Sequence, residues 1–86
     1  MNEDPGERTR IYLTAIEKSI KLADTINNPE ALRVVDYVKR YVADSKYFLE
    51  TGKTTTALAS VAYAEGLLDS LSIIGMVESK YPKPLR

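Results

Sequence analysis

The stretch from Ala43 to Gly75 constrains the fold more than any other part of the sequence. It sets a glycine, Gly52, between two segments whose apolar residues recur every three or four positions. This spacing is the signature of an amphipathic helix, and glycine readily adopts the left-handed conformation that ends helices. The stretch therefore predicts the end of one helix, a short turn with a threonine cap, and a second helix returning beside the first.

Extending the same analysis to the whole chain predicts three helices, at about 5–27, 29–51 and 54–75. The first two begin with the same pattern, because Asp4 and Asn28 can each cap a helix whose first position is a proline. Residues 76–86 contain two prolines and no periodicity, and they are expected to be extended. The 86 residues are thus predicted to form one domain, an all-α antiparallel three-helix up-down-up bundle.

The helix expected at 54–75 is apolar on most of its circumference. Its inner line is formed by Ala57, Val61, Ala64, Leu68 and Leu71, and its polar stripe is limited to Glu65, Asp69 and Ser72. Such a helix is usually buried on most sides, so we expect it to be the most buried of the three. In a three-helix monomer each helix has two neighbours. The surplus apolar surface therefore indicates a homo-oligomer or another protein as partner.

Five residues are the candidate interface. They are the exposed apolar residues of the third helix and two tyrosines one turn apart on the second: Tyr63, Leu67, Ile74, Tyr37 and Tyr41. Tyrosine is favoured at interfaces because it combines a large apolar area with a polar tip, although packing at the edge of the core is the favoured explanation of the tyrosines taken alone. Gly66 costs about 0.5–1 kcal/mol relative to alanine inside a helix. We expect another helix to cross closely there and offset this cost.

Composition excludes most of the usual chemistry. The chain has no cysteine and no histidine, which excludes the common zinc sites and the Ser-His-Asp and Cys-His nucleophile systems. Twelve basic and twelve acidic residues give a net charge of zero, so no global field attracts nucleic acid. The polar, acidic N-terminus and the lack of a long apolar run predict a cytoplasmic protein with no membrane association. No cofactor is expected.

Gly52-Lys53-Thr54 is similar to the end of a phosphate-binding loop. That loop requires another glycine five positions before Gly52, where this chain has Tyr47, and it must follow a strand rather than a helix. A helix stop is the favoured interpretation, although Lys53 could attract an anion at the start of the third helix. The alternative hypothesis is an accessory nucleic-acid or nucleotide binder that uses Lys53 and the basic tail residues Lys80, Lys83 and Arg86.

Glu65 and Asp69 lie one helical turn apart and could share a divalent cation. Metal sites in helical bundles usually draw further ligands from facing helices, and nothing in the sequence aligns such ligands. Ion pairing across the helix interface, or solvation, is the favoured interpretation of the two carboxylates. A carboxylate-metal enzyme is therefore the third hypothesis.

One block of the sequence resembles a family of short archaeal proteins, the domain-of-unknown-function family numbered 357. The matching features are YFLE-x-G at 47–52, AL at 57–58, YAEGLLD at 63–69 and the glycine at 75, within a resemblance covering about 8–78. The family usually has an acidic residue after the turn glycine, where this chain has Lys53. The resemblance implies a small all-helical domain with no assigned activity, and it gives no catalytic residues to carry over. The leading expectation is a non-enzymatic interaction module that uses its third helix.

Overall fold

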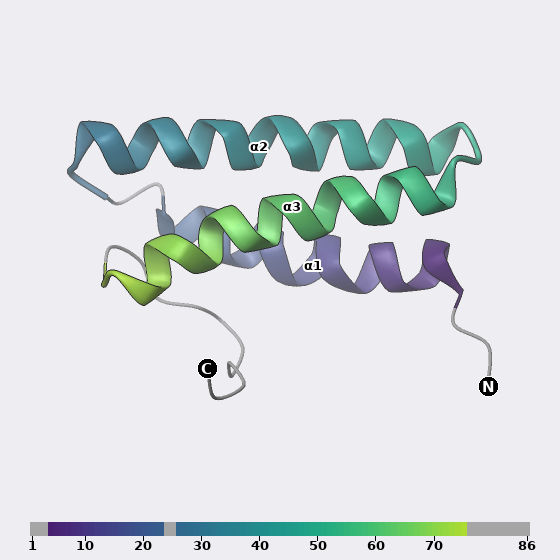
Figure 1. Cartoon of the computed structure of the whole chain (residues 1–86), viewed down its shortest axis with the longest axis horizontal. Helices are drawn as coiled ribbons and strands as arrows, with labels where there is room; N and C mark the ends of the chain where they lie inside the picture. The colour runs from purple at the N-terminus through teal and green to yellow at the C-terminus, as the bar shows by residue number, and fades with distance from the viewer. Residues whose placement is uncertain (1–3, 24–25, 76–86) are drawn as a thin grey trace.

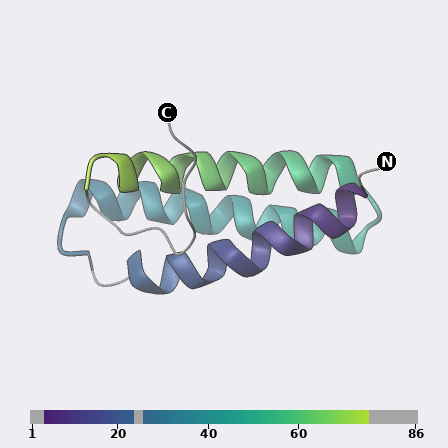
Figure 2. The ribbon, with the colours of Figure 1, turned by 90° about the horizontal axis from the view of Figure 1, so that it is seen from below.

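The computed structural model describes residues 4–23 and 26–75, and within these ranges the chain forms three helices and no strand. Helix α1 spans Pro5–Ala23, α2 spans Pro29–Glu50 and α3 spans Thr54–Ile73. Successive helices run in opposite directions and lie side by side (Figure 1). Each helix packs against the other two, and the view from below shows α1 crossing them at an angle (Figure 2). The predicted all-α up-down-up bundle is confirmed. Helix α1 ends earlier than the expected residue 27, and the tail predicted at 76–86 lies outside the described residues.

The caps predicted for the first two helices are present. The Asp4 carboxylate accepts a hydrogen bond from the backbone N–H of Gly6, at 2.9 Å. The Asn28 side chain accepts one from the N–H of Ala31, also at 2.9 Å. Each cap satisfies one of the backbone donors that an α-helix leaves free at its start.

The turn between α2 and α3 is the helix stop that the sequence predicts. Gly52 has φ +83°, a conformation that suits glycine because other residues place Cβ too close to the backbone. The N–H of Lys53 donates back to the carbonyl of Phe48 at 2.8 Å, which closes the last turn of α2. The threonine cap is wrong, however. The N-cap of α3 is Lys53, and its side chain makes no capping hydrogen bond.

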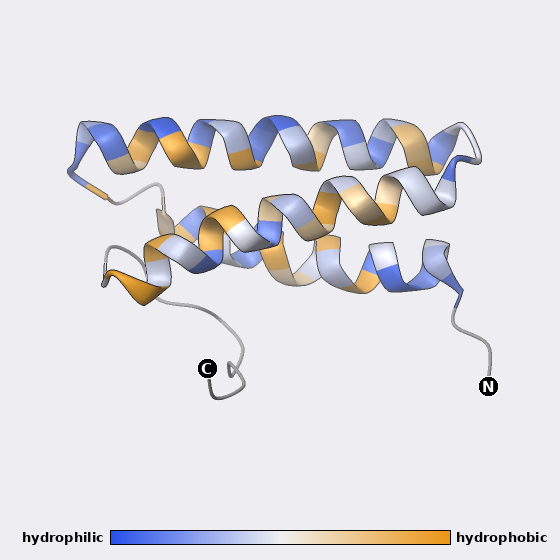
Figure 3. Cartoon of the chain, in the orientation of Figure 1, coloured by the Kyte–Doolittle hydropathy of each residue, from blue (hydrophilic) through white to orange (hydrophobic). Residues whose placement is uncertain are grey.

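The core is formed by one face of each helix, as the hydropathy colouring of Figure 3 shows for the sides that face one another. The inner line predicted for α3 is buried at all five positions. One polar link crosses this core: the Ser45 hydroxyl donates to the backbone carbonyl of Ala57 at 2.8 Å, joining α2 to α3.

Helix α3 is not the most buried helix, contrary to expectation. It has five buried residues, as does α2, and α1 has six. Ile73 and Ile74, at the end of α3, are 67% and 65% exposed. The reason is geometric. Each helix packs on two neighbours, and the arc of α3 that faces away from α1 and α2 stays open even though its residues are apolar. No helix in the described ranges has the length and hydrophobicity needed to cross a membrane.

Candidate interaction groove

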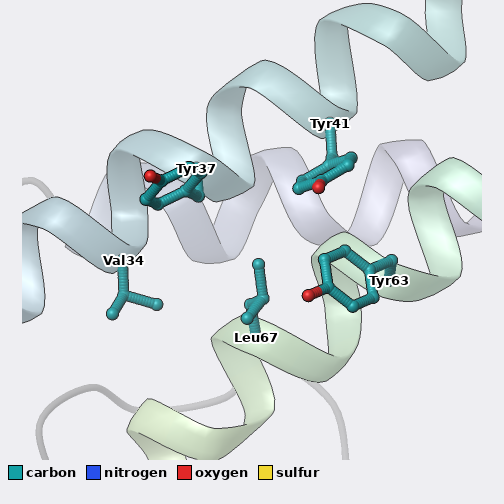
Figure 4. A pocket seen from close by; sticks show the side chains of 5 residues that line it. All are labelled: Val34, Tyr37, Tyr41, Tyr63 and Leu67. Atoms are coloured by element: carbon teal, nitrogen blue, oxygen red, sulfur yellow. The ribbon is translucent and has the colours of Figure 1, made fainter.

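A hollow of about 260 Å³ lies between α2 and α3, and no charged side chain lines it. Figure 4 shows three side chains from α2 and two from α3 surrounding it, with α1 passing behind. We call this the tyrosine groove; its lining residues are Val34, Tyr37, Tyr41, Tyr63 and Leu67. Four of the five residues predicted to form an interface are therefore brought together in one place.

Two tyrosines form the end of the groove nearest the α2–α3 turn. The rings of Tyr41 and Tyr63 meet edge to face, with centroids 4.7 Å apart and planes at 75°. This is a favoured aromatic geometry, since the positive edge of one ring meets the negative face of the other. Tyr63 is nevertheless 55% exposed, so half of its surface is available to a partner.

The outer edge of the groove is organised by Arg40. Its guanidinium lies 5.3 Å from the ring centroid of Tyr37, within range of a cation–π interaction. It also donates to the Asp36 carboxylate at 2.9 Å. Tyr37 is 51% exposed, and Arg40 restricts its ring from one side. The pairing of Arg40 with Asp36 was not predicted from the sequence, although a spacing of four residues is the signal for such a pair.

The fifth predicted residue, Ile74, lines an adjoining hollow of about 190 Å³. This hollow shares Val34 with the tyrosine groove and also lies between α2 and α3. Val34 is the residue that the interface prediction omitted. Its position three residues before Tyr37 and seven before Tyr41 places it on the same side of α2. The two hollows together form one path along the α2–α3 junction, which is uncharged in the tyrosine groove and reaches Asn28 and Glu30 in the adjoining hollow.

The polar candidates are not brought to this path or to one another. Lys53 is exposed in the turn, twelve residues or about 18 Å of helix from Glu65. Glu65 and Asp69 are half-buried, and each has an interaction partner. Within the described ranges, no group of three or more acidic side chains could hold a metal ion.

The structure also separates the residues of the phosphate and nucleic-acid hypotheses. Gly52-Lys53-Thr54 follows a helix that extends to Glu50, not the strand that a phosphate-binding loop requires. Lys80, Lys83 and Arg86 lie outside the described residues. Lys53 is thus the only residue of that basic set whose position the structure describes.

Comparison with known proteins gives one match. No curated protein and no solved structure matches the chain. The model of one family, described as "Protein of unknown function (DUF357)", matches residues 10–77. This range contains the tyrosine groove, the adjoining hollow and the α2–α3 turn. It also contains the segments 47–52, 57–58 and 63–69 and the glycine at 75, which carry the resemblance seen in the sequence. The chain belongs to the DUF357 family.

Proposed function

We propose that the protein is a non-enzymatic interaction module that binds an α-helix of a partner along the tyrosine groove. The observation that carries this proposal is the convergence of Tyr37, Tyr41, Tyr63 and Leu67 on one uncharged hollow between two helices. A groove between two helices that lie side by side can accommodate a third helix, and the residues of that helix at i, i+3, i+4 and i+7 then point into the groove.

The energetics of the groove support binding. Its side chains stand on α2 and α3, which are rigid elements, so little ordering is needed when a partner arrives. Tyr37 and Tyr63 are each about half exposed, and tyrosine is among the residues that contribute most to interface energy. Because no charge lines the groove, an apolar helix face can enter without removing water from an ion.

The test is site-specific photo-crosslinking in the cells that produce the protein. A benzophenone amino acid is placed at Tyr63, in the groove, and as a matched control at Ile11, which is 60% exposed on α1. We expect covalent adducts from position 63 and none from position 11. A second variant, Tyr37→Asp, should abolish the adducts, because it adds a charge to the wall of the groove.

Two results would overturn the proposal. One is the absence of any adduct at position 63, and the other is equal labelling at positions 63 and 11. Because Tyr37 is about half exposed, the Tyr37→Asp variant should remain folded, and circular dichroism checks this. The mass of the adduct also shows whether the partner is a second copy of the chain or a different protein.

A further inference from the structure

The structure leaves one expectation of the sequence unmet, and this concerns Gly66. No helix in the described ranges crosses at Gly66, and a Cβ added there would meet no atom of the described residues within 4 Å. The exposed residues around it on the outer arc of α3 carry no charge; they are Ala59, Ala62, Ser70 and Ile73. This arc borders the tyrosine groove, because Tyr63 belongs to both. The uncharged surface therefore extends from the groove across the outside of α3.

The opposite edge of the groove carries a row of charges whose order is informative. Arg33, Tyr37, Arg40 and Asp44 are spaced by four, three and four residues, so they follow one side of α2, and all are exposed. Arg40 is paired with Asp36. Arg33 and Asp44 have no such pair among the described residues. A cation therefore stands near one end of the row and an anion near the other.

This order is complementary to itself when a second α2 lies antiparallel to the first. If a two-fold axis passes between residues 38 and 39, Arg33 lies opposite Asp44 of the second copy, and Asp44 lies opposite the second Arg33. The same axis sets Tyr37 opposite the second Arg40. Moving the axis to residue 37 would instead place Glu30 opposite Asp44, which is a repulsive arrangement. An axis at residue 42 would set Arg40 opposite the second Asp44, but Arg40 is already paired with Asp36. Charge order thus favours the axis between residues 38 and 39.

The position of that axis on α3 can be read from contacts within the chain. Tyr41 meets Tyr63, and Val34 shares a hollow with Leu71. Because α2 and α3 are antiparallel, residue numbers rise along α2 as they fall along α3. Residues 38 and 39 of α2 lie between these two pairs, and they are therefore at the level of Gly66 on α3. The axis favoured by the charges of α2 therefore passes beside the one glycine of α3, where a Cβ would meet no atom of the described part of the chain within 4 Å. The register favoured by the charges of α2 and the open position on α3 therefore lie at the same level.

The available area fits a reversible dimer. Helices of 20–22 residues are about 30 Å long, and two of them lying about 10 Å apart present a face of roughly 600 Å². Two such faces bury roughly 1,200 Å², which is the lower end of the range for specific protein interfaces.

From these observations we infer that a second copy of this chain covers the tyrosine groove with the same face, related by a two-fold axis perpendicular to α2 and α3 at the level of Gly66, so that α2 lies against the second α2 and α3 against the second α3. The inference rests on the proposed function, since it names the partner of the same groove. A close crossing of the two α3 helices would offset the cost of a glycine inside a helix. The packing that the sequence predicts at Gly66 is then supplied between chains.

The decisive experiment uses Gly66→Cys. The chain has no cysteine, so the variant carries a single thiol, and the axis brings this thiol beside its symmetry mate. A disulfide requires Cα atoms about 4.4–6.8 Å apart, a distance reached only where helices cross closely. Oxidation by oxidised glutathione, which accepts the two electrons lost by the thiols, should give a covalent dimer. The control is Thr14→Cys, which is exposed on α1, and its dimer should form at least about tenfold more slowly.

A charge exchange tests the register independently. Arg33→Asp or Asp44→Arg alone sets like charges opposite each other twice and should weaken dimerisation about tenfold at low salt. The double variant restores both pairs and should return to the affinity of the natural sequence. Lys18→Asp, an equal charge change at an exposed site on α1, should have no effect. Light scattering over about a hundredfold range of concentration measures each equilibrium by mass action.

The outcomes separate this inference from the proposed function. A chain that stays monomeric throughout, or equal oxidation at positions 66 and 14, overturns self-pairing. If photo-adducts from position 63 then have the mass of a different protein, the groove still binds a helix and only the identity of the partner is wrong. A dimer that forms without the disulfide at position 66 overturns the two-fold axis at Gly66.

Discussion

The two sides of α2 are hollowed to a similar extent and differ in chemistry. On the side of α3 lies the tyrosine groove, of about 260 Å³ and without a charged lining residue. On the side of α1 lies a hollow of about 270 Å³ that we call the charged seam; its lining residues are Glu17, Ile20, Lys21, Lys39 and Val42. The volume of a hollow therefore does not distinguish a docking site here. What distinguishes the two is the cost of removing water from the side chains that line them.

That cost is high in the charged seam. Three of its five lining residues are charged, and beside it Lys46 donates to Glu17 in an ion pair between α2 and α1. A partner entering the seam would have to desolvate these charges, which requires new ion pairs of good geometry. The tyrosine groove has only phenol hydroxyls as polar groups, and these can stay at the wet edge of an interface. The comparison indicates that covering the tyrosine groove costs less desolvation than covering the charged seam.

The largest expected effect comes from the core that both sides share. Ile16 is fully buried on α1, and Ile16→Ala should lower the free energy of unfolding by about 2–5 kcal/mol, because it leaves a cavity. Urea denaturation followed by circular dichroism measures this loss. Ile11→Ala, at a 60% exposed site on the same helix, should change stability by less than about 0.5 kcal/mol. Similar losses in the two variants would contradict the assignment of the core.

A smaller effect is expected within the tyrosine groove. In a double-mutant cycle that replaces Tyr41 and Tyr63 by leucine, the edge-to-face contact should appear as a coupling energy of about 0.5–1.5 kcal/mol. Denaturation at a concentration where the chain is monomeric isolates this coupling from association. A parallel cycle with Tyr47, whose ring meets Phe48 instead, and Tyr63 should give no coupling. Equal coupling in both cycles would show that the groove geometry is not the source.

Spacing in the sequence was sufficient to predict the inner line of α3, the stop at Gly52 and the gathering of the tyrosines. A helical wheel fixes which residues share a side, and Tyr37 and Tyr41 must face the same way whatever they pack against. The wheel does not say where the neighbouring helices lie. For this reason the exposure of Gly66 could not be predicted, since its open arc depends on how α1 and α2 divide the circumference of α3 between them.

Two further features were beyond the sequence for a different reason. Lys53 became the N-cap of α3 because the Gly52 turn sets where the helix starts, and the threonines that follow already lie inside it. The pairing of Lys46 with Glu17 joins residues 29 positions apart. Any of several cations on α2 could reach that carboxylate until the rotation and offset of the two helices are known. Local patterns give elements and sides, whereas such pairs depend on packing.

The smallest expected effect belongs to the charged seam, and it tests the comparison through salt. The Lys46 and Glu17 side chains are 50% and 45% exposed, so Glu17→Gln should cost at most about 1 kcal/mol at low ionic strength. At about 1 M salt, where the Debye length is about 3 Å, this cost should vanish. Tyr63→Leu should lose the same free energy at both salt concentrations, because its contacts are apolar and aromatic. Denaturation of the two variants at two ionic strengths checks both. A cost for Glu17→Gln that persists at high salt would mean that the ion pair is shielded from water. The charged seam and the tyrosine groove would then no longer differ in the cost of removing water from their side chains.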